Sequence, residues 1–105
     1  MTIEKFNGNI QGEVLEKKGV VVMKFMAAWC GPCKQLAPIV EEISEEMKDI
    51  SFIEIDVDQY GDISSELGVR SVPTMLIFKD GKESGRCIGY MGKDACKKKI
   101  ESSIK

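Results

Sequence analysis

A pair of cysteines separated by two residues is the feature of this sequence most able to do chemistry. The pair lies in the stretch Trp29-Cys30-Gly31-Pro32-Cys33. Two cysteines at this spacing can exchange a dithiol for a disulfide, or they can supply half of a zinc site. A zinc site needs a second ligand pair, but Cys87 and Cys96 are nine positions apart and the chain has no histidine. The spacing therefore favours a redox pair and predicts no metal.

The position of the pair supports this interpretation, because it falls where a predicted buried strand ends and a predicted helix begins. At a helix N-terminus, unpaired N–H groups and the positive end of the helix dipole favour a thiolate, which is the nucleophile in disulfide exchange. Cys30 precedes the helix, so we expect it to be exposed and to attack the substrate. Cys33 lies one turn into the helix, so we expect it to be shielded and to act as the resolving thiol.

The neighbours of the pair suit the same chemistry. Pro32 fits the first turn of a helix and stiffens the loop. Trp29 would offer a flat apolar surface to a substrate chain, although it could instead be an ordinary core aromatic.

Hydrophobic patterns predict the elements that position the pair. Residues 20–26 are too continuously apolar for a half-exposed strand, so they indicate a strand buried on both faces of a sheet. A helix is predicted from residue 32 to about residue 49, because apolar residues recur at the helical period. Pro38 lies inside this helix and lacks an N–H group, so a kink is expected there.

The remaining elements complete an α/β fold in a single domain over residues 1–105. Their order predicts one mixed sheet with helices on both faces. They are a strand at 2–6, a helix from Asn7 or Asn9 to about 18, a strand at 51–57, a short helix at 62–67, a hairpin of strands 74–79 and 83–88 around Asp80-Gly81, and a helix at 93–104.

The composition excludes several other functions. The formal net charge is −2, and the basic run Lys97-Lys98-Lys99 is expected on the solvated face of the last helix, so no nucleic-acid site is predicted. The longest apolar run is too short to span a membrane, and the first residues do not resemble a secretory signal. We expect a cytoplasmic monomer without a cofactor, in a compartment where stable structural disulfides are uncommon.

The Trp-Cys-Gly-Pro-Cys stretch after a buried strand, followed later by Val72-Pro73-Thr74, resembles the thioredoxin family over nearly the whole chain. The resemblance implies the thioredoxin fold, with a central mixed sheet of four to five strands flanked by helices on both faces. It implies a general protein-disulfide reductase, or dithiol electron carrier, that serves disulfide-containing client proteins and is re-reduced by a thioredoxin reductase. Two alternatives remain: an oxidant or isomerase of an oxidising compartment, and a binding subunit whose thiols do no work.

The resemblance also implies a substrate groove beside the cysteines. Pro73 would follow a cis peptide bond, which would leave the Val72 backbone able to pair with an extended substrate. Gly89, with Tyr90 beside it, matches a glycine that lines the same groove. The implied groove residues are Trp29, Gly31, Pro32, Val72, Pro73 and Gly89.

One pair of residues departs from the family pattern. The family carries a buried aspartate where this chain has Lys24, and usually a lysine where this chain has Glu54. A charge in each of two adjacent buried strands is costly unless the two charges meet, so we expect these side chains to contact each other beneath the cysteines. Glu54 could accept a proton from Cys33, Lys24 could stabilise the thiolates, or both residues could be structural.

Three further residues are predicted to have no part in the chemistry. Cys96 lies on the apolar stripe of the last helix and is expected in the core. Cys87 faces the opposite way from Ile88 in its strand, so we expect it to be exposed, as a spare surface residue or a regulatory thiol. Met26 stands where the family often has a tryptophan, and no change of function is expected from it.

Overall fold

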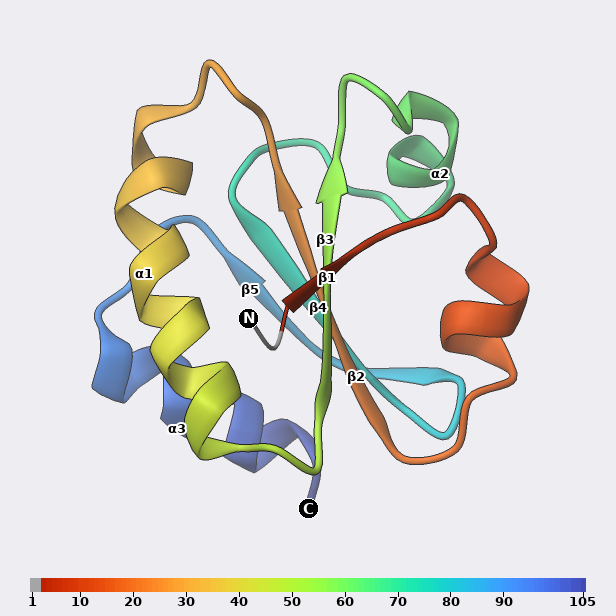
Figure 1. The fold of residues 1–105 in the computed structure, drawn as a ribbon, viewed down its shortest axis with the longest axis vertical. Helices are drawn as coiled ribbons and strands as arrows, with labels where there is room; N and C mark the ends of the chain where they lie inside the picture. Colours follow the sequence, from red (N-terminus) through yellow and green to blue (C-terminus); the bar gives the residue numbers. More distant parts are fainter. Residues whose placement is uncertain (1–2) are drawn as a thin grey trace.

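The computed structural model describes residues 3–105 and has one mixed sheet between two layers of helices (Figure 1). The expected strand at residues 2–6 is present from Ile3, and Thr2 lies outside the described residues. In chain order the elements are β1 (Ile3–Lys5), a short π-helix η1 (Gln11–Leu15), β2 (Val20–Met26), α1 (Gly31–Glu46), β3 (Ser51–Asp56), α2 (Gly61–Glu66), β4 (Thr74–Lys79), β5 (Lys82–Ile88) and α3 (Lys93–Ser103).

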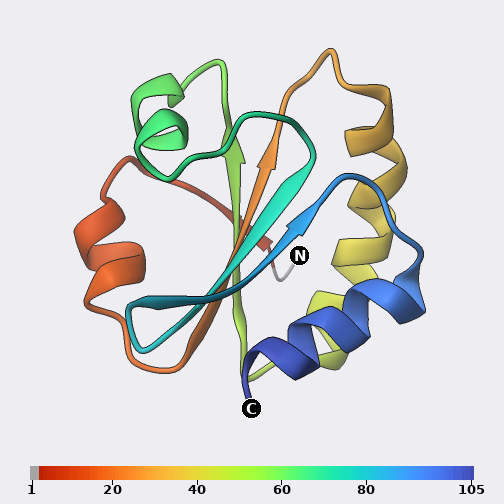
Figure 2. The same cartoon turned by 180° about the vertical axis from the view of Figure 1, so that it is seen from behind.

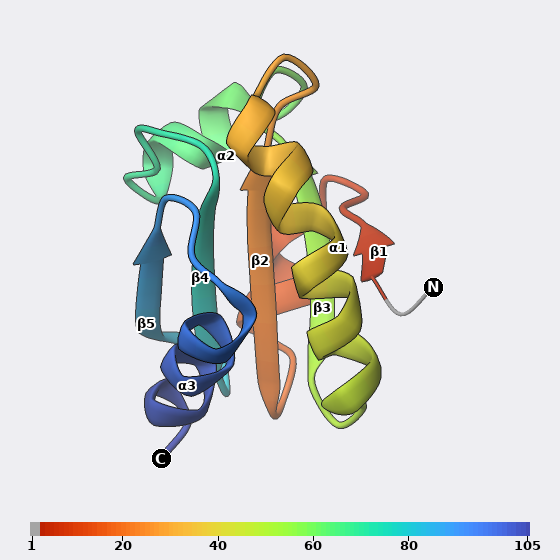
Figure 3. The same ribbon diagram turned by 90° about the vertical axis from the view of Figure 1, so that its left-hand side faces the viewer.

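The strand order in the sheet is β1-β3-β2-β4-β5. β1 and β2 pair parallel to β3, whereas β4 pairs antiparallel to both β2 and β5. α1 and α3 cover one face of the sheet, which Figure 3 views directly, and η1 and α2 cover the other (Figures 1 and 2). The predicted fold class is therefore confirmed, with five strands. The carboxyl ends of β2 and β3 and the amino end of α1 lie at the same end of the molecule (top in Figure 1).

β2 is the centre of the sheet and is buried on both faces, as its composition predicts. Val22 packs into the core under α1 and α3, whereas Met23 and Phe25 pack into the core on the opposite face. These side chains are fully buried. The strand is therefore a rigid support, and the cysteine pair follows directly after it.

The first helical segment is shorter than predicted. It ends at Leu15 rather than near residue 18, and Gly19 then turns the chain with φ +89°. Val14 is the only buried residue of η1, so little apolar area is available to stabilise further turns. Asn9 contributes at the start as expected, because its Oδ1 accepts a hydrogen bond from the Gly12 N–H at 3.0 Å.

The hairpin between β4 and β5 turns at Asp80-Gly81, as predicted. Both residues have positive φ, +51° and +84°, which is the backbone of the tight two-residue turn that favours this sequence. β5 then contains a bulge, because Ile77 pairs with Gly85 while Phe78 pairs with Glu83. The residue between, Ser84, therefore has no partner opposite it in the pairing, and it donates its hydroxyl to the Ile77 carbonyl at 3.2 Å.

α1 and α3 are joined by ion pairs at Glu46. The Glu46 carboxylate accepts from Lys93 Nζ and from Lys97 Nζ, the latter at 2.8 Å. Hydrogen bonds from these two lysines lower the pKa of Glu46 to about 2. Part of the basic run in α3 is thus engaged with α1 rather than only solvated. No helix within residues 3–105 is long and apolar enough to cross a membrane.

Candidate redox site

Cys30 and Cys33 form a disulfide at the N-terminus of α1, with their Cα atoms 5.3 Å apart. Cys30 is the N-cap of the helix, and its Sγ accepts a hydrogen bond from the Cys33 N–H at 3.1 Å. Pro32 lies in the first turn, where its missing N–H group has no cost. The helix therefore directs an N–H group and the positive end of its dipole at the Cys30 sulfur, and this arrangement stabilises a thiolate there once the disulfide is reduced.

The expected exposure of Cys30 is wrong for this disulfide form. Cys30 is 4% exposed and Cys33 is 5% exposed, so both are buried. The Cys30 sulfur turns inward to bond with Cys33, and the pair packs against Val57 and Val72. Cys30 Sγ also lies 3.7 Å from the Val72 carbonyl oxygen. The two cysteines thus differ in their surroundings rather than in their exposure.

Trp29 is a surface residue, so the core alternative is excluded. It is 69% exposed, and its Nε1 donates a hydrogen bond to Asp58 Oδ2 at 2.9 Å. Asp58 is held in turn by its own N–H, which bonds to Asp56 Oδ1 at 2.9 Å. The sequence reasoning missed Asp58. Its position just after β3 was the available signal, because the carboxyl ends of adjacent parallel strands meet at one edge of the sheet.

Residues that are distant in sequence also lie beside Cys30. The Val72–Pro73 peptide bond is cis. Gly89 donates its N–H to the Pro73 carbonyl at 2.8 Å and has φ +86°, a conformation that favours glycine. A Cβ at Gly89 would meet no atom within 4 Å, so the space above this residue is open. The structure therefore brings Val72, Pro73 and Gly89 together next to the disulfide.

Several residues next to the disulfide and Gly89 are exposed to solvent. Ile88 is 66% exposed and Tyr90 is 49% exposed, and they lie on either side of Gly89. Gly31 and Pro32 are exposed at the start of α1. Sequence reasoning singled out Gly89 with Tyr90 but did not include Ile88.

Lys24 and Glu54 make the contact that the sequence predicts. They are opposite each other in the β2–β3 pairing, and Lys24 Nζ lies 3.0 Å from Glu54 Oε1. The Lys24 side chain is 5% exposed, whereas that of Glu54 is 28% exposed. A cavity of about 110 Å³ is lined by both residues and by Cys33. The pair therefore lies next to Cys33, and the catalytic roles of the two residues remain predictions.

Glu54 also lines a second cavity, nearer the edge of the sheet. This cavity has a volume of about 130 Å³ and is formed with Lys5, Met26 and Asp56. The pairing of β1, β3 and β2 places Lys5 and Lys24 on either side of Glu54. Glu54 thus lies between two lysines in the sheet, is paired with Lys24, and borders both cavities.

The expected exposure of Cys87 is wrong. Cys87 is 3% exposed and belongs to the same core cluster as Cys96, which is fully buried as predicted. Cys87 does face away from Ile88, but α3 covers that face of β5, so it is Ile88 that meets solvent. Burial raises the pKa of Cys87 and raises the pKa of Cys96 to about 12. Neither thiol has the character of a reactive cysteine.

No group of three or more histidine, cysteine, aspartate or glutamate side chains within residues 3–105 is arranged to hold a metal ion.

A disulfide at the N-terminus of a helix, beside the carbonyl that precedes a cis proline, defines a thiol–disulfide oxidoreductase when it stands on this five-stranded sheet. The thioredoxin family model matches residues 1–102. Thioredoxin from Mycoplasmoides gallisepticum is 44% identical, over 85% of this chain and 89% of the relative. Thioredoxin from Bacillus subtilis is 39% identical, over 83% of this chain and 85% of the relative.

Solved structures give the same result. A mutant thioredoxin from Halobacterium salinarum has a TM-score of 0.87 and 36% identity, covering 98% of this chain and 91% of its own. The thioredoxin NaTrxh from Nicotiana alata has a TM-score of 0.88 and 34% identity, and the match covers 99% of this chain and 94% of the NaTrxh chain. The chain belongs to the thioredoxin family. It is a carrier that cycles between the Cys30–Cys33 dithiol and disulfide, and proteins of this family act with reductases and disulfide-containing clients.

Proposed function

We propose that this protein is a general protein-disulfide reductase, re-reduced by a thioredoxin reductase. The observation that carries the proposal is the position of the Cys30 sulfur. It accepts the Cys33 N–H at the start of α1, and it lies 3.7 Å from the Val72 carbonyl. The atom best placed to become a thiolate is therefore next to the backbone best placed to hold a client.

The exchange takes two steps that transfer two electrons to the client. The Cys30 thiolate attacks one sulfur of a client disulfide, so a mixed disulfide forms and the second client sulfur leaves as a thiolate. Cys33 then loses its proton and attacks the Cys30 sulfur, which restores the Cys30–Cys33 disulfide and releases the first client sulfur as a thiolate. Both client thiolates take protons from solvent.

Client binding is assigned to the groove beside the disulfide. An extended client segment would pair with the Val72 backbone and lie over the exposed Trp29 indole and the open space above Gly89. Main-chain pairing with shallow apolar contact gives broad rather than sharp client choice. The proposed groove residues are Trp29, Gly31, Pro32, Val72, Pro73 and Gly89.

The proton of Cys33 is assigned to Glu54, through water. The cavity that Cys33 shares with Lys24 and Glu54, about 110 Å³, is large enough for a water molecule. Most of its lining is apolar, so Lys24 and Glu54 are the groups that would hold this water. Because the Glu54 side chain is 28% exposed, a proton taken from Cys33 can pass from it to solvent. Lys24 is the charge partner that holds the Glu54 carboxylate in place.

The protein is proposed to be a cytoplasmic monomer in which residues 1–105 form one domain. The buried, unpaired thiols of Cys87 and Cys96 suit a reducing compartment, where such thiols persist. A sedimentation experiment tests whether the protein is a monomer. A measured reduction potential tests whether it acts as a reductase. A potential as oxidising as that of an oxidant or isomerase would contradict the reductase assignment.

Insulin reduction tests the proposal as a whole. Wild-type protein with a reductase and its electron donor should precipitate insulin chains, and Cys30→Ser should abolish the activity. Cys33→Ser should instead accumulate a stable mixed disulfide with the client, because no resolving thiol remains. Full activity in a variant with both cysteines replaced by serine would favour a non-catalytic binding module.

A further inference from the structure

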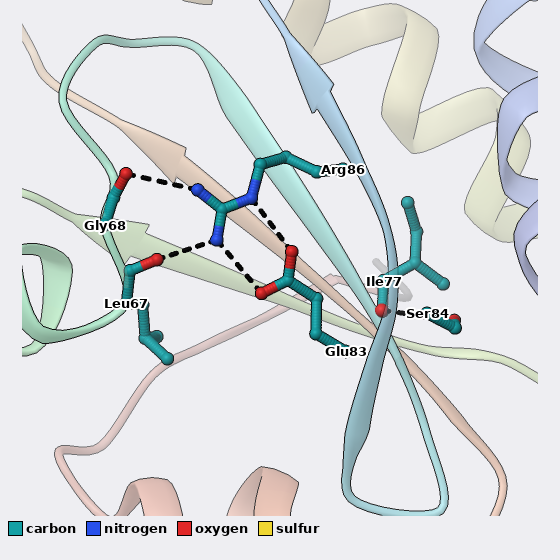
Figure 4. A network of polar contacts seen from close by, with 6 residues as sticks. All are labelled: Leu67, Gly68, Ile77, Glu83, Ser84 and Arg86. Carbon is teal, nitrogen blue, oxygen red and sulfur yellow. Dashed lines mark hydrogen bonds and ion pairs between the residues drawn. The ribbon is translucent and has the colours of Figure 1, made fainter.

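The bulge in β5 places two charged residues on the same face of the strand. Glu83 and Arg86 are three positions apart, so they would point to opposite faces of a regular strand. The unpaired residue Ser84 between them shifts the pattern by one and returns both to one face. Arg86 then contacts the Glu83 carboxylate at two points, Nε to Oε2 and Nη2 to Oε1, each at 2.9 Å (Figure 4).

The guanidinium also reaches the end of α2. Nη1 donates to the Gly68 carbonyl at 3.1 Å, and Nη2 donates to the Leu67 carbonyl at 2.7 Å. Carbonyl groups at the end of a helix lack partners within the helix and carry the negative end of its dipole, so a cation is favourable there. Figure 4 shows the guanidinium between these two carbonyls and Glu83. Arg86 therefore ties the end of α2 to β5.

The segment that Arg86 holds leads directly to the redox site. Only residues 69–71 separate Gly68 from Val72, whose carbonyl lies 3.7 Å from the Cys30 sulfur. Arg86 itself lies two residues before Ile88, where β5 ends and the turn through Gly89 begins. The guanidinium thus connects the two segments that form the groove, and the Gly89 N–H to Pro73 carbonyl bond connects them again nearer the disulfide.

We propose that Arg86 is a positioning residue for client binding, because it fixes the segment 67–72 against β5 and so holds the Val72 backbone ready to pair with a client. The inference rests on the client groove described under Proposed function. Arginine is specific to this task because its planar group offers five donors, enough for a two-point contact with Glu83 and for both carbonyls. Lysine keeps the charge but lacks this geometry.

The effect of replacing Arg86 should depend on which disulfide substrate the protein reduces. A peptide disulfide must pair with the Val72 backbone, so its binding should depend on Arg86. A small aromatic disulfide needs only the Cys30 sulfur, so its reduction should not. A role limited to overall stability would affect both substrates alike.

Single-turnover kinetics of the pre-reduced protein test the proposal, with an oxidised peptide and a small aromatic disulfide as substrates. Arg86→Lys should raise the half-saturating concentration of the peptide by about fivefold and leave the limiting rate within about twofold, since a misaligned backbone weakens binding before it slows sulfur exchange. The rate with the small disulfide should not change. Glu83→Gln, which leaves the two carbonyl contacts in place, should have a smaller effect. Hydrogen exchange at residues 69–72 should be faster in Arg86→Lys.

The outcomes separate this inference from the proposed groove. If wild-type protein saturates with the peptide and folded Arg86→Lys saturates at the same concentration, the role of Arg86 is wrong and the groove stands. Equal losses with both disulfides would also overturn it, because they indicate a general structural effect. If wild-type protein itself shows no saturation with the peptide, the client groove is wrong, and the role of Arg86 is wrong with it.

Discussion

The indole of Trp29 is tied to the carboxylate of Asp58 by a hydrogen bond of 2.9 Å. The bond joins the loop that follows β2 to the loop that follows β3, so it crosses the end of the sheet at which the disulfide lies. The indole nevertheless remains 69% exposed. An apolar ring that faces solvent is thereby held in one orientation by its polar edge, so the proposed client groove would offer an ordered surface at Trp29 rather than a mobile side chain.

Removing the Asp58 carboxylate should release this ring. We expect Asp58→Ala to lower the fluorescence anisotropy of Trp29, which is the only tryptophan of the chain, and to cost no more than ~1 kcal/mol of unfolding free energy, because the bond is exposed. The control is Asp62→Ala, which removes an exposed carboxylate from α2. Equal anisotropy in wild type and both variants would show that packing alone orients the indole.

Replacing Glu54 tests the proposed proton acceptor. Glu54→Gln should slow the resolution of the mixed disulfide at neutral pH by about 100-fold or more, because a general base typically contributes about 10²- to 10⁴-fold, and the loss should shrink as hydroxide increases. Stopped-flow kinetics across pH measure it. Asp56→Asn is the matched control, because Asp56 does not line the cavity at Cys33, and asparagine keeps the Oδ1 that accepts the Asp58 N–H. An unchanged rate and pH profile in Glu54→Gln would remove Glu54 as the base and leave two alternatives, electrostatic stabilisation by Lys24 or a structural role for both residues.

The same substitution should affect stability, since Lys24 would remain buried without its counter-charge. We expect the unfolding free energy to fall by about 1–3 kcal/mol, which is less than for a fully buried pair because Glu54 is partly exposed. Urea unfolding measures the loss. Replacing both residues together, Lys24→Met with Glu54→Leu, should recover most of it. A double variant as unstable as Glu54→Gln would show that the charge is not the cause.

The ion pairs of Glu46 give a pH-dependent contribution to stability. The pKa of Glu46 falls from an ordinary 4.5 to about 2 in the folded protein, so its contribution is complete above pH 4.5 and is lost as the pH falls toward 2. Glu46→Gln should therefore lower the melting temperature at pH 7, and the difference from wild type should vanish near pH 2. Glu45→Gln is the matched control, because it removes the neighbouring exposed carboxylate and leaves the ion pairs of Glu46 in place.

The two buried thiols should be inert in the native protein. Burial raises the pKa of Cys87 above its ordinary value and that of Cys96 to about 12, and it also keeps reagents away from both sulfurs. We expect the oxidised protein to consume no thiol reagent when folded, and to consume two equivalents in denaturant, one from each free cysteine. Rapid labelling of Cys87 in the folded protein would instead restore the regulatory-thiol interpretation.

Much of the fold and the centre of the site could be predicted from the sequence, where one local pattern decided the structure. The continuous apolar run of β2 has no stable place except the middle of a sheet, and the Asp80-Gly81 dipeptide favours one kind of turn. The Lys24–Glu54 contact was predictable for a similar reason, because two charges in adjacent buried strands must meet.

The features that could not be predicted depend on what lies across the sheet. Cys87 is buried because α3 covers one face of β5, and no pattern within β5 indicates which face that is. Cys30 is buried because its sulfur bonds to Cys33 beneath Val72, a residue 42 positions away. The contacts of Arg86 require the bulge at Ser84, which exists only in the pairing of β5 with β4.

The two outer strands of the sheet also limit unwanted association. β1 has only three residues, and β5 is interrupted by its bulge and carries Lys82, Glu83 and Arg86. Short, bulged and charged edges are poor templates for a strand of another molecule, so they oppose edge-to-edge aggregation. A protein that is proposed to pair with many unfolded or extended chains at Val72 thereby avoids pairing with its own copies along the margins of its sheet.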